Sequence, residues 1–414
     1  MGLLVEEVDL AREPWFRRRL FQTATLAGLS GPAAVGLAAA DMPDTATVDV
    51  QQFGAKGDGH SDDAPAINRA IQFVREHPMR APGLSFARRL VFPTGLYAVE
   101  SPLNLTGLWN LNAVIEGQGA VILGRCRGQP VIDALGSRWL SVRDLTVVGD
   151  NDATPKLGLQ IGRLNDGRVA DNHQLVNVKL VGHFTLACLL NNAAETTGFH
   201  HVFCWNDRPD PDSFCLIQDG LGHFGAVSSF VPNQHAGPER DKSFNENEFI
   251  NCDFRHGGGG MPVWLGDTAR HRFYRCYAAS TGDASFVLYC GDNSHTMLDV
   301  DCHCEAKGLQ SVFWVTGQGT NAVIRGFSYK DHGIFAARSV FARQSPVRHV
   351  TLQHARLEMG HFFEPQCRVL DDPAGWRLTG EVYLSEPDRW NGEKSFAGVL
   401  FLGDSVYQKA TQIR

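Results

Sequence analysis

Acidic and histidine side chains concentrate in two segments of the sequence that could perform acid and base chemistry. The first is a loop rich in aspartate and proline, and the second is a stretch in which apolar and polar residues alternate. The candidate catalytic residues are Asp207, Asp210, Asp212 and His223 in and after the loop, and Asp299, Asp301 and His303 in the alternating stretch. Closely placed carboxylates can take different pKa values, so that one donates a proton while the other accepts one.

The alternating stretch has the two-residue period of a β-strand. Leu298, Val300, Cys302 and Cys304 alternate with Asp299, Asp301, His303 and Glu305. If the apolar set faces a core, the other set forms one outward row of three carboxylates and a histidine. An ordinary solvated strand face has the same pattern, so both interpretations stay open.

Basic and aromatic residues in neighbouring, similar segments could bind a ligand beside this row. The candidate substrate-binding residues are Arg275, Tyr277, Arg325 and Tyr329. Aromatic rings can stack on the faces of sugar rings, and arginines can pair with uronate carboxylates. If these segments are adjacent strands, they predict a groove for a sugar chain.

The second half of the sequence repeats itself at intervals of about two dozen residues. The cysteines of three similar segments, Cys252, Cys276 and Cys302, lie 24 and 26 residues apart. Similar segments in the first half begin near Asn112, Leu140 and Leu175, and their longer spacing predicts inserted loops. Repeats of this length predict a solenoid, in which a stacked core is structural and the exposed face and its loops carry function.

Residues 48–107 contain the most specific pattern in the chain. Glycines at 54, 57 and 59 precede Ser61, Asp62 and Asp63, which are suited to capping a helix and complementing its dipole. The apolar positions that follow have the spacing of one buried helical face; they are Ala66, Ile67, Ala70, Ile71 and Val74. Residues 89–99 then predict a strand, a Pro-Gly turn and a second strand.

This order of motifs is similar to the start of the rhamnogalacturonase/epimerase-like branch of the pectate-lyase-like superfamily. The matching residues are Phe53-Gly54-Ala55-x-Gly57-Asp58-Gly59, the aspartates 62 and 63, the helix, and Val91-Phe92-Pro93-x-Gly95-x-Tyr97. The resemblance implies an all-β fold, a single-stranded right-handed parallel β-helix (pectin-lyase-like) with a short N-terminal capping helix. It also implies that Asp58, Asp62 and Asp63 are structural.

The expected division of the chain follows from these patterns. Residues 1–40 are expected to be a signal peptide, residues 48–107 the N-terminal cap and first coils, residues 108–385 the parallel β-helix, and residues 386–414 a C-terminal tail or cap.

The aspartate-rich loop is similar to part of a polygalacturonase-type motif. Asp207-x-x-Asp210-Pro211-Asp212-Ser213 matches most of Asp-Gly-x-Asp-Pro-Asp-Ser, in which an aspartate helps to activate water for inverting hydrolysis. Arg208 replaces the glycine, and the segment around His223 has one residue more than the Gly-His-Gly element and follows too soon. A turn rich in Asp and Pro for conformational reasons is the alternative.

The N-terminal residues have the composition of an export signal. Arg18, Arg19 and Phe21 form an Arg-Arg-x-Phe core, followed by a small and apolar stretch that ends in three alanines before Asp41. This pattern is similar to the twin-arginine signal, which implies an exported protein, periplasmic or extracellular in a bacterium. An N-terminal anchor helix is the alternative, although the stretch is short for a span and contains three glycines and a proline.

Composition limits the partners and cofactors of the chain. Lys and Arg total 38 against 45 Asp and Glu, which argues against nucleic acid as a partner. After the leader no apolar run is long enough for a membrane span. The ten cysteines lack paired CxxC spacing, so they are expected to be mostly buried thiols, with Cys302 and Cys304 the only close pair.

Three functions fit these patterns, all with a polysaccharide as partner, and the oligomeric state is left open. The first is a glycoside hydrolase for an acidic or deoxysugar-containing polysaccharide, which would use two carboxylates and no cofactor. The second is a polysaccharide lyase or uronate C5-epimerase, which would need a base such as Lys242, Arg275 or Arg325 and could use calcium. The third is a non-catalytic glycan-binding protein that uses the β-helix as a rigid shelf.

Overall fold

The computed structural model describes the chain in two levels of detail. Side chains are described for residues 46–79, 87–108, 112–164, 170–219, 246–266 and 271–280. For residues 80–81, 84–86, 244–245 and 268–269, and for ten strands between residues 286 and 402, only the strand and its register are described. The predicted signal peptide lies outside the described residues.

The strands form three parallel stacks, numbered here in the order in which each coil visits them. Stack 1 contains β1 (Thr47–Asp49), β5 (Arg89–Phe92), β8 (Val114–Gly117), β11 (Ser141–Arg143), β14 (Gln174–Val176), β17 (Gly198–His200), β21 (Glu248–Ile250), the first parts of β25 (Arg272–Ser280) and β27 (His295–Ala306), β29 (Asn321–Arg325), and the first parts of β32 (His349–Glu358) and β34 (Trp376–Leu384). Stack 2 contains β2 (Asp58–Asp62), β6 (Leu96–Val99), β9 (Val121–Gly124), β12 (Thr146–Gly149), β15 (Lys179–Gly182), β18 (Phe203–Asn206), β22 (Asp253–His256), the second parts of β25, β27, β32 and β34, β30 (Ser328–Lys330) and β35 (Val399–Leu402).

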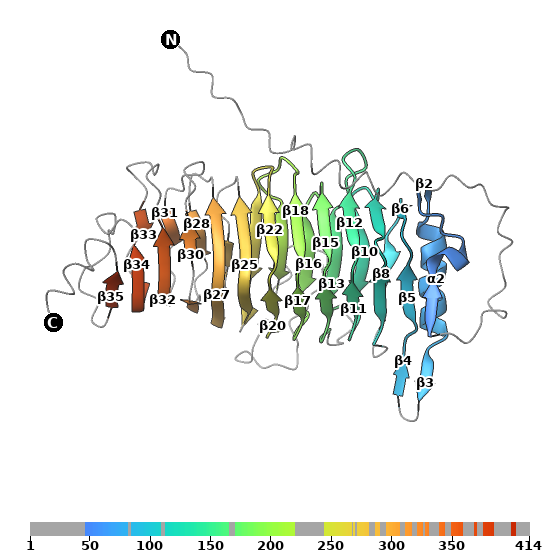
Figure 1. The fold of residues 1–414 in the computed structure, drawn as a ribbon, viewed down its shortest axis with the longest axis horizontal. Helices are drawn as coiled ribbons and strands as arrows, with labels where there is room; N and C mark the ends of the chain where they lie inside the picture. Colours follow the sequence, from blue (N-terminus) through green and yellow to red (C-terminus); the bar gives the residue numbers. More distant parts are fainter. Residues whose placement is uncertain are drawn as a thin grey trace, which may run out of the picture.

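Stack 3 is a separate ten-stranded parallel sheet. It contains β7 (Leu103–Asn104), β10 (Pro130–Leu135), β13 (Leu157–Gly162), β16 (Ala187–Asn192), β19 (Phe214–Asp219), β23 (Met261–Gly266), β26 (Phe286–Tyr289), β28 (Ser311–Thr316), β31 (Ser339–Arg343) and β33 (Arg368–Leu370). Each coil runs from stack 1 to stack 2 to stack 3 and returns one strand further along the axis (Figure 1). The predicted right-handed parallel β-helix is confirmed.

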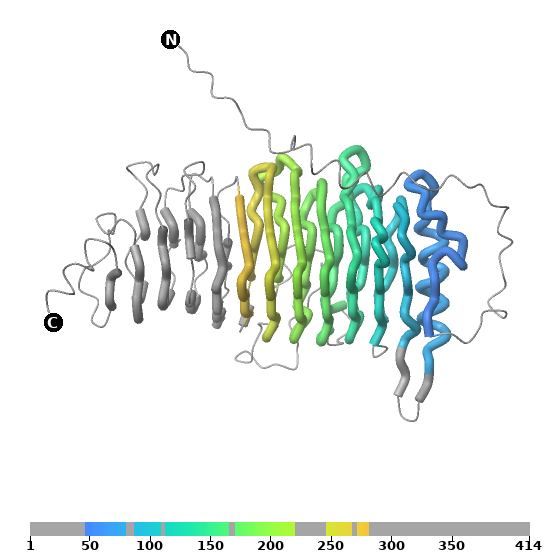
Figure 2. Tube along the Cα trace, viewed as in Figure 1, coloured from blue at the N-terminus to red at the C-terminus, as the bar shows by residue number. Residues whose placement is uncertain are grey.

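The predicted capping helix is confirmed as α2 (Ala64–Glu76), which lies at the N-terminal end of the stacks (Figure 2). Its apolar stripe is buried as expected, with Ile67 and Ala70 at 0% exposure. The 3-10 helix η3 (Val50–Phe53) packs beside it, and β3 (Met79–Ala81) and β4 (Leu84–Phe86) form an antiparallel hairpin that projects from this end (Figure 1). Burial of these side chains closes the end of the core against water.

The aspartates of the cap motif have structural roles, although not all in the predicted way. Asp63 is the N-cap residue, but its carboxylate accepts hydrogen bonds from the backbone amides of Lys56 and Gly57, at 2.6 and 3.0 Å. Asp62 supplies the capping bond instead, accepting from the amide of Ala64 at 3.0 Å. The helix start and the glycine loop are therefore fixed by different carboxylates.

A tight corner joins stack 1 to stack 2 in successive coils. Among the residues whose side chains are described, the corner residue has a positive φ near 50° in five coils; these residues are Asp144, Asn177, His201, Asn251 and Arg275. The amide of each of the first four donates to the carbonyl just before the corner of the next coil, at 2.9 or 3.0 Å. Short polar side chains tolerate this conformation best, and Arg275 is the exception among them.

The interior of the coils is filled by side chains stacked in register. Phe199, Phe249 and Phe273 are register partners, and their rings are parallel within about 5°, with centroids 4.3 and 4.2 Å apart. Their spacing is close to the strand separation of a β-sheet, so the backbone repeat places ring on ring. The six described cysteines are buried and unbridged, which confirms the prediction of free thiols for those positions.

The repeat found in the sequence corresponds to the strand register. In the first half, Ile115 pairs with Val142, and Val142 with Leu175, so the similar segments there are neighbouring strands of stack 1. Around Cys252 and Cys276, the pairing also follows the predicted step of 24 residues.

Replacing Phe249 by alanine should destabilise the coil strongly. The change removes the middle ring of the stack and leaves a cavity, so the free energy of unfolding should fall by about 3–5 kcal/mol. Denaturation in urea measures this loss. Tyr274→Ala on the outside of the same stack, where the side chain is 46% exposed, is the control and should lose less than about 1 kcal/mol. Equal losses in the two variants would contradict the stacked core.

Candidate functional site

The loop of predicted catalytic aspartates joins β18 to β19 and is described with its side chains. Asp207 directly follows β18, and Asp210 and Asp212 lie in the turn before β19. His223 and Lys242 lie outside the described residues. For Asp299, Asp301, His303, Arg325 and Tyr329 the structure gives the strand and the register.

An arginine and three aromatic rings form a continuous surface on the outer side of stack 2. Cζ of Arg255 lies 4.8 Å from the ring centroid of Tyr277, 5.9 Å from that of Phe203 and 6.0 Å from that of Trp205. These four side chains, hereafter the arginine–aromatic face, come from the adjacent strands β18, β22 and β25. Each is partly exposed, and each alternates with a buried core residue along its strand.

Asp253 holds the guanidinium group of the arginine–aromatic face in place. Its two carboxylate oxygens accept from Nε of Arg255 at 2.8 and 3.1 Å and from Nη2 at 2.7 Å. Because both residues lie on β22 two positions apart, their side chains extend from the same side of the strand. The ion pair fixes the plane of the guanidinium, which presents a flat surface together with the rings.

Asp207 lies at the end of the arginine–aromatic face. One of its carboxylate oxygens accepts a hydrogen bond from the indole Nε1 of Trp205. Burial raises the pKa of Asp207, while the Trp205 hydrogen bond and the nearby His183 oppose this effect. A carboxyl group with a raised pKa keeps its proton to a higher pH than an ordinary aspartate, which favours the role of a general acid.

The other two loop aspartates are in different surroundings. Asp210 accepts from Nε of Arg208 at 3.3 Å and from the amide of Asp212 at 3.0 Å. Asp212 is exposed at the tip of the turn. The alternative that this loop is a turn rich in Asp and Pro for conformational reasons therefore holds in part, because Asp210 stabilises its own turn.

A buried histidine connects this loop to the next coil. His256 is 2% exposed, and its Nε2 lies 2.9 Å from Oγ of Ser213, which donates to the carbonyl of Asp210 at 2.7 Å. Nδ1 of His256 accepts from the amides of Gly258 and Gly260, at 3.2 and 3.0 Å. These bonds require a neutral ring with its proton on Nε2. Burial lowers the pKa of His256 to about 4, and Asp210 opposes the shift.

Residues 257–260 are four consecutive glycines, hereafter the glycine run, and they have a packing role that the sequence does not reveal. A Cβ atom on Gly258 would lie 1.9 Å from the carbonyl oxygen of Arg208, and one on Gly260 would lie 2.2 Å from that of Ser213. A Cβ on Gly257 would lie 2.4 Å from a carboxylate oxygen of Asp207. These three glycines are therefore the surface against which the aspartate loop packs.

The register separates the members of the predicted outward row. Asp299 pairs with Arg272 and Asp301 with Tyr274, both on stack 1, whereas His303 pairs with Tyr277 on stack 2. Between these pairs β25 has one residue more than β27, because Arg275 occupies the corner. The row thus continues onto both stacks. His303 and Glu305 lie on stack 2, where Glu305 pairs with Ala279, the register partner of Arg255.

The candidate substrate-binding residues are also divided between stack 1, stack 2 and the corner that joins them. Tyr277 is part of the arginine–aromatic face, while Arg275 is an exposed corner residue whose Cζ lies 5.1 Å from the ring of Tyr274. Arg325 pairs with Asp299 on stack 1, and Tyr329 pairs with Cys304, whose partner Ala278 is in the core. Their substrate-binding roles stay predictions.

Sequence reasoning missed Phe203, Trp205 and Arg255. The alternation of Phe203 and Trp205 with Cys204 was a usable signal, as was the alternation of Asp253 and Arg255 with Phe254. Only the register shows that these two pairs are neighbours, because the coils that carry them are offset by 50 residues.

The described residues give no indication of a metal centre or a membrane span. Within them, no three His, Cys, Asp or Glu side chains are grouped so that they could hold a metal ion. None of the helices described is long and apolar enough to cross a membrane.

Residues 47–202 match a family model described as rhamnogalacturonase A/epimerase, pectate lyase-like. The match covers the cap motif and the coils up to the beginning of the candidate site. No curated protein matches the chain at a significant level.

Solved structures with the same architecture come from different proteins. The chain is similar to ORF18 of Geobacillus virus E2 (TM-score 0.60, 14% identity), with 82% of this chain and 62% of the viral protein covered. PfbA, a surface adhesin of Streptococcus pneumoniae, follows with a TM-score of 0.57, 13% identity and 81% and 85% coverage. The A-module of the mannuronan C-5 epimerase AlgE6 of Azotobacter vinelandii has a TM-score of 0.50, 13% identity and 86% and 98% coverage. At these identities the likeness establishes the fold.

The buried His256 should make the stability of the protein depend on pH. Its pKa of about 4 lies below the ordinary value of 6.5, so the unfolded chain takes up the proton first. Stability is therefore complete above about pH 6.5 and falls as the pH drops toward 4. His256→Gln should make this slope shallower by up to about 1.4 kcal/mol per pH unit, measured by urea denaturation at a series of pH values. A residual slope is expected from His173, whose pKa burial also lowers to about 4. An unchanged slope in the variant would contradict the neutral His256.

Proposed function

We propose that this protein, which has the right-handed parallel β-helix fold of the pectate-lyase-like superfamily, binds a polysaccharide on the outer side of stack 2 and hydrolyses it there. The observation that carries the proposal is Asp207, a half-buried carboxyl with a raised pKa at the end of the arginine–aromatic face. The family model that matches residues 47–202 names a rhamnogalacturonase and an epimerase, which supports a saccharide substrate.

The arginine–aromatic face supplies the binding surface in this proposal. The rings of Phe203, Trp205 and Tyr277 offer apolar surfaces for the CH faces of sugar rings, and the fixed guanidinium of Arg255 offers charge for an acidic sugar. Neighbouring strands of a stack are about 4.8 Å apart, so the face extends across coils, along the axis of the β-helix. An extended chain is a better match to this shape than a compact ligand.

Asp207 acts as the general acid. Its protonated carboxyl donates a proton to the glycosidic oxygen as the bond to the anomeric carbon breaks, and a water molecule attacks that carbon. The indole N–H of Trp205 holds the carboxyl in place. A second carboxylate must accept the proton of the water, and Asp210 and Asp212 of the same loop are the candidates.

Export is part of the same proposal. The Arg18-Arg19-x-Phe21 pattern supports a twin-arginine signal, and a polymeric substrate has to be met outside the cytoplasm. We therefore infer a periplasmic or extracellular site of action.

Asp207→Asn should lower the rate of hydrolysis by about 10²- to 10⁴-fold, because the amide cannot donate the proton. Reducing ends released from a panel of acidic and deoxysugar-containing polysaccharides measure the rate. Asp152→Asn, in an exposed turn after stack 2, is the matched control and should keep full activity. Product masses distinguish the reaction classes, since hydrolysis adds a water that elimination and epimerisation do not. Full activity of the Asp207 variant, or unsaturated products, would overturn the assignment.

Gly257→Ala should also reduce activity while leaving every ionisable group in place. The added methyl would overlap the carboxylate of Asp207 and displace it from Trp205, so kcat should fall more than KM changes. Circular dichroism and the melting temperature show whether the coil is intact. A variant with normal kcat would show that the position of Asp207 does not matter for the reaction.

A further inference from the structure

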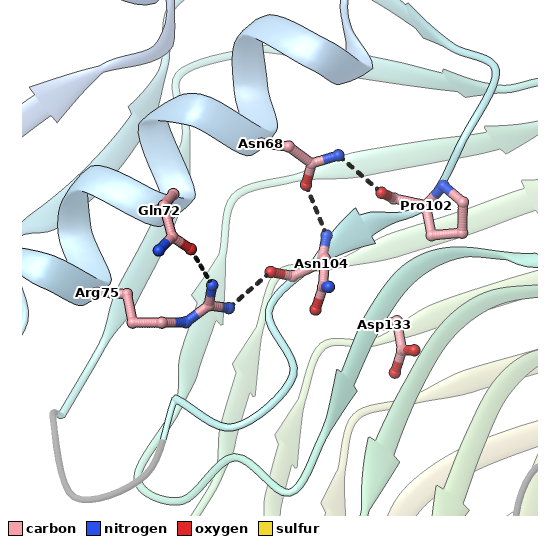
Figure 3. A pocket seen from close by; sticks show the side chains of 6 residues that line it. All are labelled: Asn68, Gln72, Arg75, Pro102, Asn104 and Asp133. Atoms are coloured by element: carbon pink, nitrogen blue, oxygen red, sulfur yellow. Dashed lines mark hydrogen bonds between the residues drawn. The ribbon is translucent and has the colours of Figure 1, made fainter.

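A polar pocket lies between the capping helix and stack 3, away from the arginine–aromatic face. Its volume is about 500 Å³, within the range of small-molecule sites. It is lined by Asn68, Gln72 and Arg75 of α2, by Pro102 and Asn104, and by Asp133 of β10 (Figure 3). The proposed hydrolytic site is on another stack and several coils further along, so the two sites cannot share one sugar ring.

The walls of the pocket are held by hydrogen bonds to the backbone. Asn68 donates to the carbonyl of Pro102 at 2.9 Å and accepts from the amide of Asn104 at 2.8 Å. Arg75 donates to the carbonyls of Asn104 and Thr106, both at 3.1 Å. The helix and the strand that face each other across the pocket are therefore fixed before any ligand arrives (Figure 3).

Two side chains in the pocket keep unused hydrogen-bonding groups. Asn104 uses Oδ1 to accept from the amide of Thr106 at 3.0 Å, and in the described part of the chain its Nδ2 has no partner. Asp133 uses Oδ1 to accept from the amide of Leu135 at 3.2 Å, and Oδ2 has none among the same residues. The two residues are register partners on β7 and β10, whose strands lie about 4.8 Å apart, so the side chain with the unused donor neighbours the one with the unused acceptor.

The row of register partners that contains Asn104 and Asp133 changes from polar to apolar along stack 3. In register, Asn104 and Asp133 are followed by Gln160 and then by Leu190, Ile217 and Trp264. The last three form an apolar cluster separate from the main core. Gln160 is only 5% exposed, and within the described residues its amide makes no hydrogen bond. Among the described residues, the fully buried side-chain atoms that lack a partner belong to His173 and Gln218, so the amide of Gln160 reaches the surface, where a ligand can bond to it.

We propose that this pocket is a second saccharide-binding site, which takes an uncharged sugar residue. Arg75 and Asp133 balance each other in charge, which favours a neutral ligand over an anion or a cation. Hydroxyl groups both donate and accept, so neighbouring hydroxyls of one sugar can bond to Nδ2 of Asn104 and Oδ2 of Asp133 together. The amide of Gln160 provides a further contact at the next position of the row.

A site of this kind would hold a glycan segment on a different side of the β-helix from the proposed site of hydrolysis. Two separate contacts with one polymer raise its effective concentration at each of them. Binding at the pocket does not depend on hydrolysis, so it can be tested whether or not the protein is an enzyme.

Isothermal titration of the whole protein with a panel of neutral mono- and disaccharides tests the site. At least one sugar should bind the wild type, and Asp133→Asn should weaken it by at least about tenfold, because the acceptor becomes a donor while the bond to Leu135 is kept. Asp152→Asn, at an exposed carboxylate outside both sites, is the matched control and should bind the same sugar with unchanged affinity. Absence of binding by every sugar, or equal affinity of wild type and Asp133→Asn, would overturn the proposal.

Gln160→Leu separates a ligand role from a structural one. Leucine restores the apolar row seen at Leu190, so the variant should melt at the same or a higher temperature than the wild type. Its affinity for the sugar should nevertheless fall by at least about tenfold. Unchanged affinity in this variant would remove Gln160 from the site, and together with an unaffected Asp133 variant would exclude the site altogether.

Discussion

In-register hydrogen bonding between successive coils is the constraint on which the rest of this structure depends. Apart from those at the ends of a stack, the described strands of the three stacks are paired on both sides with strands of neighbouring coils, so a residue's neighbours are its counterparts one coil before and after. This arrangement produces the stack of Phe199, Phe249 and Phe273 inside the helix and the arginine–aromatic face outside it. The same periodicity thus builds the core and the surface that we propose to be functional.

The local parts of the fold could be predicted because they depend on short stretches of sequence. The buried stripe of α2 is visible as an apolar spacing, and the cap motif, the strand pairs and the 24-residue step follow from patterns within a few tens of residues. The stack-1 corner was harder to find. Its left-handed residue is an Asp, Asn, His or Arg, and nothing in the type of Arg275 indicates such a conformation.

The candidate site depended on long-range register, which the sequence does not determine by pattern alone. Trp205 and Arg255 are neighbours although 50 residues separate them, because an insertion lengthens the coil between them. The repeat in the sequence does not give the length of this insertion. Sequence reasoning identified Asp207 and Tyr277, which lie at opposite ends of this surface, but assigned them to separate sites. His303 belongs to the predicted outward row and pairs with Tyr277, so the strand register joins that row to the arginine–aromatic face.

The contact between the aspartate loop and the glycine run has a consequence for how relatives of this protein can diverge. Arg208 and Ser213 touch Gly258 and Gly260 so closely that no side chain fits between them. The two segments are about 50 residues apart in the sequence, yet a larger side chain in one of them requires the backbone of the other to move away. Evolution should therefore preserve or replace them as a unit, and pairs of positions that vary together across these two loops would mark lineages in which the chemistry of this part of the protein has changed.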